Sequence, residues 1–193
     1  MQTTAHYLLT GRLVRPRFVR FAALFYGSLT VAAILWSGLR GLDPRFFGHS
    51  AVLSALLGAL TAAATVSLGL MAYRLLHVLR EVAEELAPRL VDGARRWDLV
   101  LVSVFSGVGE EAFFRGALQP LVGLVAASLI FGALHVGPDR RYLVWTVWAV
   151  LAGFLFGALY EVTEGLLAPI LAHAGHNAAT LLLWKRLRKG SAP

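Results

Sequence analysis

Long apolar runs are the feature that most constrains how this chain can fold. Six of them lie between charged residues or Gly and Pro, at approximately 21–39, 50–76, 99–118, 121–136, 142–160 and 166–184. Most approach the roughly 20 residues that an α-helix needs to cross a bilayer. Of the 193 residues, 58% are hydrophobic and 15% are charged, which is more apolar surface than a water-soluble domain of this size can bury. We therefore expect an all-α, polytopic transmembrane helical bundle of about six spans.

The run 121–136 is the shortest of the six. It falls below the usual spanning length, so a tilted, locally thinned or re-entrant segment is expected there. The first run follows a cluster of Arg residues, as in a signal peptide, but no small-residue cleavage pattern follows Leu39. We interpret it as a retained first span.

Positive charge predicts the orientation of these spans. With six crossings, four groups of cations fall on one side of the membrane, which the positive-inside rule makes the cytoplasmic side together with both termini. The groups are Arg12, Arg15, Arg17 and Arg20; Arg74, Arg80, Arg89, Arg95 and Arg96; Arg140 and Arg141; and Lys185, Arg186, Arg188 and Lys189. Because these cations do not form one stripe, anionic lipid headgroups are the expected partners and nucleic acid is not.

Two regions can be distinguished along the chain. Residues 1–97 are expected to contain two spans and an amphipathic segment at 77–97, which suits either a helix along the membrane interface or a solvated helical loop, interrupted by Pro88. Residues 98–189 are expected to form the functional core. The whole chain is treated as one membrane domain. It has no cysteine, which excludes disulfides and thiol catalysis.

The third apolar run contains three ionisable residues, Glu110, Glu111 and Arg115. At roughly 3 kcal/mol each at mid-membrane they cost about 9 kcal/mol, whereas about ten Leu, Val and Phe return only roughly 3 to 6 kcal/mol. This helix therefore needs polar partners from its neighbours, and ionisable groups inside a membrane are candidate functional residues.

Helical spacing distinguishes the two carboxylates. Glu111 and Arg115 are four residues apart, the favourable order for an ion pair on one face, whereas Glu110 points about 100° away from Glu111. Glu110 has no such partner on its own helix, so it is expected to meet a histidine, a water molecule or a proton. It is the candidate general base.

Two later runs supply the remaining polar groups. His135 ends the fourth run, and His173 and Asn177 share one face of the sixth, where Ala172, Ala174, Gly175 and Ala178 permit close helix packing. A carboxylate and a histidine can deprotonate a water, and a second histidine and an amide can stabilise an oxyanion.

Each of these residues also has a structural interpretation. A single intramembrane His or Asn commonly forms hydrogen bonds between helices, and a Glu near an Arg is usually a structural pair. Glu110, His135, His173 and Asn177 on three separate runs are harder to explain as independent structural groups. His176, about 60° from His173 on the helix, is expected to be structural or to support the site from outside.

Three ordered motifs carry a family resemblance. They are Glu-Glu-x-x-x-Arg (Glu110, Glu111 and Arg115, with Phe114), Phe-x-x-x-His (Phe131 and His135) and His-x-x-x-Asn (His173 and Asn177). In their order and separation, residues 98–185 resemble the CAAX protease and bacteriocin-processing family of type II CAAX prenyl endopeptidase-like membrane proteins, including its bacterial myxosortase-like branch.

The resemblance implies an intramembrane glutamic endopeptidase without a covalent intermediate. Glu110 would be the base, with His135 helping to hold the water. His173 and Asn177 would form the oxyanion site, and Glu111, Arg115, Phe114 and Phe131 would support it. No cofactor is expected. Zinc, which a Glu and two His can bind, ranks lower because the chain lacks His-Glu-x-x-His. This chain is expected to have about six spans, whereas eukaryotic members have eight. The difference puts recognition of a prenylated tail in doubt.

The expected function is therefore endopeptidase activity on a membrane-tethered, lipidated or C-terminally anchored protein, in a bacterial inner membrane. A non-catalytic scaffold or bacteriocin-immunity protein, which would tolerate Glu110→Gln, is one alternative. A small proton-coupled transporter is another, although the chain shows no two related halves.

Overall fold

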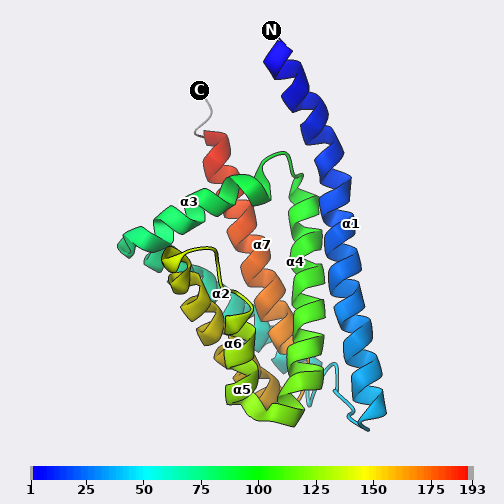
Figure 1. Cartoon of the computed structure of the whole chain (residues 1–193). Coiled ribbons are helices and arrows are strands. Elements are labelled where there is room, and N and C mark those ends of the chain that lie inside the picture. Colours follow the sequence, from blue (N-terminus) through cyan, green and yellow to red (C-terminus); the bar gives the residue numbers. More distant parts are fainter. Residues whose placement is uncertain (1, 191–193) are drawn as a thin grey trace.

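Helices make up every regular element of the described chain. The computed structural model describes the backbone of residues 2–190 and the side chains of residues 18–188, so the cationic side chains of Arg12, Arg15, Arg17 and Lys189 lie outside it. The α-helices are α1 (Gln2–Leu39), α2 (Ala51–Leu75), α3 (His77–Val91), α4 (Arg96–Glu111), α5 (Gln119–Ala133), α6 (Leu143–Thr163) and α7 (Leu167–Gly190), with a π-helix η1 (Ala112–Leu118) and a 3₁₀-helix η2 (Arg140–Tyr142). The predicted all-α bundle is confirmed (Figure 1).

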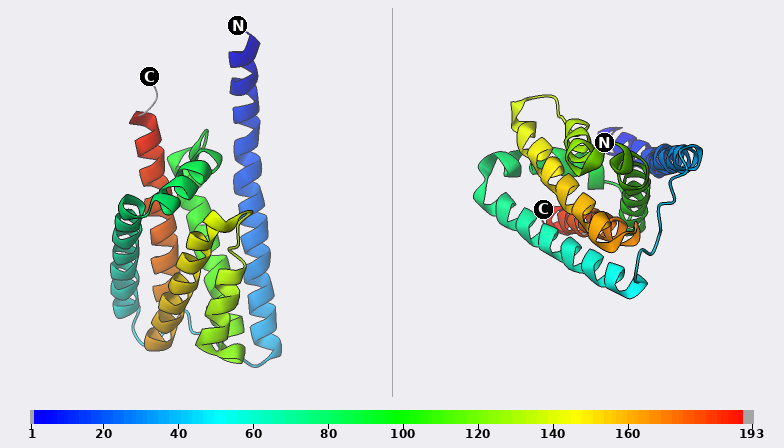
Figure 2. Two further views of the ribbon diagram at one scale, coloured as in Figure 1. Left: turned by 60° about the vertical axis from the view of Figure 1, so that its left-hand side comes forward. Right: turned by 90° about the horizontal axis from the view of Figure 1, so that it is seen from below.

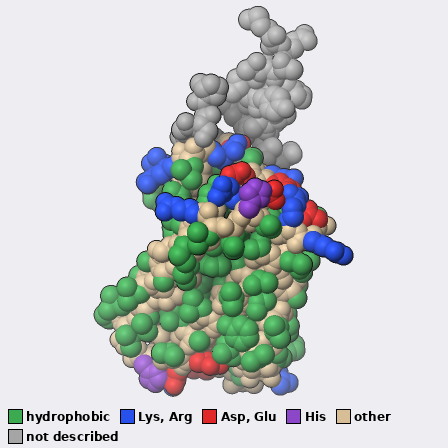
Figure 3. Space-filling view, turned by 90° about the vertical axis from the view of Figure 1, so that its left-hand side faces the viewer, with side chains coloured by type: hydrophobic (Ala, Val, Ile, Leu, Met, Phe, Trp, Pro, Cys, Tyr) green, Lys and Arg blue, Asp and Glu red, His purple; other side chains and the backbone are tan. Residues whose placement is uncertain are grey.

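Four helical segments of the described chain are long and apolar enough to cross a membrane. They are Phe18–Leu39, Ala51–Leu75, Arg96–Ala133 and Arg140–Thr163. The outward-facing side chains of these segments are largely apolar, among them Leu24 (72% exposed) and Val147 (56% exposed). Figure 3 shows apolar side chains covering the middle of one face, with charged side chains at both ends and most of them toward the upper end. Such a surface suits lipid, so the chain is an integral membrane protein.

The number of spans differs from the six expected. The third and fourth predicted runs lie in one helical stretch that reverses direction at Gly123, whose φ of 79° favours glycine. From there to Ala133 the chain rises only about 15 Å, half of the roughly 30 Å apolar layer. The sixth run, α7, contains His173, His176 and Asn177, which make it less apolar than the other spans.

Both ends of the described chain lie at one end of the bundle, where α1 begins and α7 ends (Figure 1). This agrees with an even number of passages across the bundle. Which side of the membrane that end faces stays a prediction, as does the division of the chain at residues 97 and 98.

Small residues place α7 in the interior, packed against α2, α4 and α6 (Figure 2). A Cβ atom added to Gly107 of α4 would lie 2.9 Å from the Cβ of Ala174, and one added to Gly175 would lie 2.9 Å from the Cβ of Ala62. The expected close approach of a helix to the small residues of α7 is therefore confirmed.

The amphipathic segment forms α3, which crosses one end of the bundle (Figure 1). It buries Val82, Ala83, Ala87 and Val91 on one face and contains Pro88 in its last turn. Polar contacts hold its middle and its C-terminal end: Arg141 and the Tyr142 hydroxyl donate to Glu85, and Arg188 donates to Asp92. This helix therefore braces the loop that follows α5.

Candidate active site

A change of helix type marks the polar centre of the bundle. The α-helical hydrogen bonding of α4 ends at Glu111, and the seven residues of η1 continue as a π-helix. Short π-helical turns are rare and occur frequently at functional sites. Apolar spacing does not predict this turn, because the same spacing also fits an α-helix.

A buried triad occupies this turn. Glu111 Oε2 accepts a hydrogen bond from Arg115 Nε at 2.9 Å, and both side chains are fully buried. Glu111 Oε1 accepts a second hydrogen bond from His173 Nδ1 of α7 at 2.7 Å. The predicted pairing of Glu111 with Arg115 is therefore confirmed, and the bond to His173 adds a link between two helices that spacing alone did not predict.

Aromatic rings enclose the Arg115 guanidinium. Its central carbon lies 5.4 Å from the ring centroid of Phe131 and 5.9 Å from that of Phe114, and these two rings meet edge to face at 5.0 Å. Neither terminal nitrogen of Arg115 has a hydrogen-bond partner among the described residues. Cation–π contacts thus offset part of the cost of burying this charge. The supporting role of the two phenylalanines in catalysis stays a prediction.

Glu110 lies beside the triad without joining it. Its side chain is 13% exposed, and its Oε2 atom lies 4.0 Å from His173 Nε2, beyond hydrogen-bond distance. This oxygen is buried and has no hydrogen-bond partner in the described part of the chain. As helical spacing predicted, Glu110 is therefore not held in the ion pair with Arg115, and its Oε2 atom is available to bind a water or a ligand.

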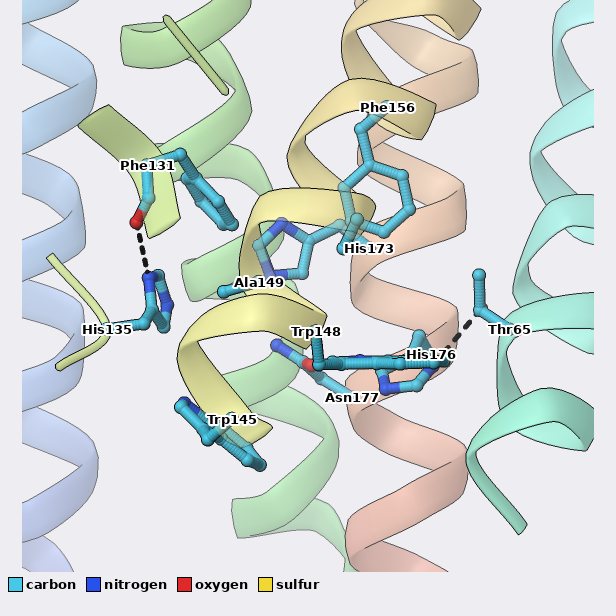
Figure 4. A pocket seen from close by; sticks show the side chains of 11 residues that line it. Thr65, Phe131, His135, Trp145, Trp148, Ala149, Phe156, His173, His176 and Asn177 are labelled. Atoms are coloured by element: carbon cyan, nitrogen blue, oxygen red, sulfur yellow. Dashed lines mark hydrogen bonds between the residues drawn. The ribbon is translucent and has the colours of Figure 1, made fainter. Parts of the chain in front are cut away.

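A small cavity brings the other predicted residues together (Figure 4). Its volume is about 60 Å³, enough for a few water molecules. Its lining includes His135, His173, Asn177, Phe131, Phe156 and Trp148, but does not include Glu110, which lies next to His173. Three of the four predicted catalytic residues thus share one cavity, and the fourth approaches it from α4.

Hydrogen bonds fix how two of these groups face the cavity. His135 Nδ1 donates to the Phe131 carbonyl at 2.7 Å, which leaves its Nε2 atom as an acceptor. Asn177 Nδ2 donates to Ser106 Oγ at 3.1 Å, and the Ser106 hydroxyl donates to the Ser103 carbonyl. One N–H of the Asn177 amide remains for a ligand. Sequence reasoning missed Ser106, since a serine inside a helix commonly bonds only its own backbone.

His176 lies at the outer edge of the cavity. Thr65 Oγ1 donates to a carbonyl of its own helix, so His176 Nδ1 donates to this hydroxyl at 3.1 Å. The indole of Trp148 lies 5.8 Å from the His176 ring. His176 therefore connects α7 with α2, in agreement with the structural role expected of it.

An apolar groove continues outward from this edge. It has a volume of about 370 Å³ and lies between α2, α3, α6 and α7. Trp145, Trp148 and His176 line both the groove and the small cavity. Leu70, Leu183 and Trp184 line its outer part, and Arg74 adds a cation. The polar centre is thus continuous with an apolar surface that faces lipid.

The described side chains contain no group of three or more His, Cys, Asp or Glu placed to hold a metal ion. Glu111 is occupied by Arg115 and His173, whereas the bond from His135 Nδ1 to Phe131 leaves His135 Nε2 open. The expected absence of a metal cofactor stays a prediction.

The fold and the site define a polytopic helical membrane protein with a buried carboxylate and histidine centre. The family model described as type II CAAX prenyl endopeptidase Rce1-like matches residues 93–179, which contain every predicted site residue. Residues 93–179 therefore belong to the Rce1-like family.

One curated protein supports this assignment. The uncharacterized protein YpbD of Bacillus subtilis (strain 168) is 37% identical to this chain over 75 residues. The aligned part covers 39% of each of the two proteins, so the chain spans well under half the length of this relative. No solved structure matches the chain.

Proposed function

We propose that this protein is an intramembrane endopeptidase that hydrolyses a peptide bond with a water activated by Glu110. One observation carries the proposal: an unpaired carboxylate lies 4.0 Å from a histidine that lines a water-sized cavity with His135 and Asn177. The match of residues 93–179 to the Rce1-like family supports a CAAX-type protease in general.

In the proposed first step, Glu110 takes a proton from the water as its oxygen attacks the peptide carbonyl. His135 Nε2, left as an acceptor by the bond from Nδ1 to Phe131, receives a second hydrogen bond from this water and orients it. A new C–O bond forms, and the carbonyl oxygen becomes an oxyanion.

The second step breaks the C–N bond. The free N–H of Asn177 and the Nε2 side of His173 stabilise the oxyanion, while Glu111 accepts from His173 Nδ1 and fixes the ring. As the oxyanion collapses, Glu110 returns its proton to the leaving amine. Water and peptide thus become an acid and an amine with no covalent enzyme intermediate and no metal in the proposed scheme.

The apolar groove supports a membrane-tethered substrate. The cavity of about 60 Å³ admits water but no peptide, whereas the adjoining groove of about 370 Å³ has the size of ordinary ligand sites. Because the two share Trp145, Trp148 and His176, a protein segment held in lipid can reach the cavity through the groove. We therefore propose a lipidated or C-terminally anchored protein as substrate, in a bacterial inner membrane, with both termini of the enzyme cytoplasmic.

Terminal mass spectrometry tests the proposal. Membranes of cells expressing wild type, Glu110→Gln or Glu161→Gln are compared for protein termini. Glu161 is a matched control because it lies on α6 and bonds Gln119, away from the cavity. At least one terminus should vanish with Glu110→Gln and persist with Glu161→Gln. If every terminus persists in both variants, the protease is ruled out, and a scaffold, immunity protein or transporter takes its place.

A further inference from the structure

One stripe of α1 packs against the bundle, and Tyr26 lies on it. Ala22, Ala33 and Ser37 are at most 4% exposed and follow one another at helical spacing, while Leu24 and Phe25 face outward. Tyr26 is four residues after Ala22 and is partly buried. It is therefore an inward-facing residue of a helix that lies outside the family-matched segment.

Gly109 brings Tyr26 against the catalytic carboxylate. A Cβ atom added to Gly109 would lie 2.7 Å from the Tyr26 carbonyl oxygen and 2.8 Å from its Cβ, so only glycine permits this approach. Glu110 is the next residue, and the Tyr26 hydroxyl lies near enough to its carboxylate to interact with it. A phenol buried in an apolar span requires such an acceptor.

We infer that Tyr26 is a positioning residue for Glu110, so that α1 completes the active site. Glu110 lacks a partner on its own helix, and its Oε2 atom has none elsewhere in the described chain. A hydroxyl from α1 restrains one side of the carboxylate and leaves the other free for water. The ionisable groups shown to act on Glu110 are then Tyr26 of α1 and His173 of α7.

Infrared spectroscopy tests this contact without requiring activity. The carboxylate stretching band of Glu110 is identified by its loss in Glu110→Gln. Tyr26→Phe should shift this band, because one hydrogen-bond donor is removed. Tyr160→Phe, which deletes a hydroxyl from a half-buried tyrosine of α6, should leave the band in place. An unshifted band in Tyr26→Phe, or an equal shift in both variants, would overturn the assignment.

Kinetics test the catalytic consequence, which rests on the proposed function. With the substrate found by terminal mass spectrometry, Tyr26→Phe should lower kcat about 10- to 100-fold at unchanged KM, because a misplaced base slows the reaction without weakening binding. Gly109→Ala, which moves α1 while keeping the hydroxyl, should lower kcat similarly. A purely structural Tyr26 would instead lower the melting temperature and leave kcat per folded molecule unchanged. A shifted band without any proteolysis would confirm the contact and refute the protease.

Discussion

Removing the positive charge of the buried triad should be one of the most damaging single changes to this fold. Arg115→Met keeps an unbranched apolar stem but removes the guanidinium, which leaves the fully buried Glu111 carboxylate with His173 alone. Removing one partner of a buried ion pair costs about 3–5 kcal/mol. We expect a loss of this size in the free energy of unfolding, measured by equilibrium denaturation in mixed micelles and followed by circular dichroism.

Two further variants test whether uncompensated buried charge causes this loss. Arg188→Met breaks an ion pair with Asp92 whose side chains are 41% and 51% exposed, so the same substitution there should cost far less than at Arg115. The double variant Glu111→Gln/Arg115→Met removes both charges of the pair, so neither is left without its partner. The amide oxygen of Gln can still accept a hydrogen bond from His173. The double variant should be at least about 2 kcal/mol more stable than Arg115→Met. If the double variant is no more stable than Arg115→Met, uncompensated charge is the wrong explanation.

Four more outcomes are expected. Ser106→Ala, which removes the acceptor of the Asn177 amide, should lower kcat about 10-fold with little change in melting temperature, measured on the identified substrate. A strong chelator should leave cleavage unchanged, and loss of cleavage restored by zinc would establish a metalloenzyme. Hydrogen bonds from Arg141 hold the pKa of Asp139 below its usual 3.8, so their contribution is full above that pH and is lost as the pH falls through the lower folded value. The melting-temperature difference between wild type and Asp139→Asn should accordingly shrink below pH 3.8. Phospholipids with brominated acyl chains should quench Trp145, Trp148 and Trp184 in a Trp36→Phe/Trp97→Phe background if the groove opens to lipid, and unchanged fluorescence would mean that it is closed.

Local patterns predicted the parts of this structure that depend on single helices. The pairing of Glu111 with Arg115 follows from i, i+4 spacing, which the change to a π-helix did not abolish. Apolar periodicity located the helices, and small residues indicated where α7 packs closely, as Gly175 against Ala62 shows. The requirement that charge inside a membrane find partners led directly to the site.

Features that depend on two or more helices were not predictable from these patterns. The reversal at Gly123 and the π-helix lie where α5 packs on α6 and where η1 packs on α1. Apolar spacing alone is compatible with an ordinary α-helix in both places. The rotation of α7 against α4 decides that His173 Nδ1 bonds Glu111, with its Nε2 side toward Glu110. The spacing of residues within one helix does not determine how that helix is rotated relative to another.

The charge of the whole cluster connects these contacts with the chemistry. With both carboxylates ionised, Glu110, Glu111 and Arg115 together carry one uncompensated negative charge in an almost closed apolar interior. In the proposed mechanism a proton on His173 balances that charge and at the same time makes Nε2 a donor on the side where the oxyanion would form. Without Arg115 the same cluster would hold two negative charges, which one histidine cannot balance. The proposed mechanism therefore gives Arg115 a role both in stability and in the donor function of His173, so Arg115→Met should reduce stability and kcat together, whereas Ser106→Ala should reduce kcat alone.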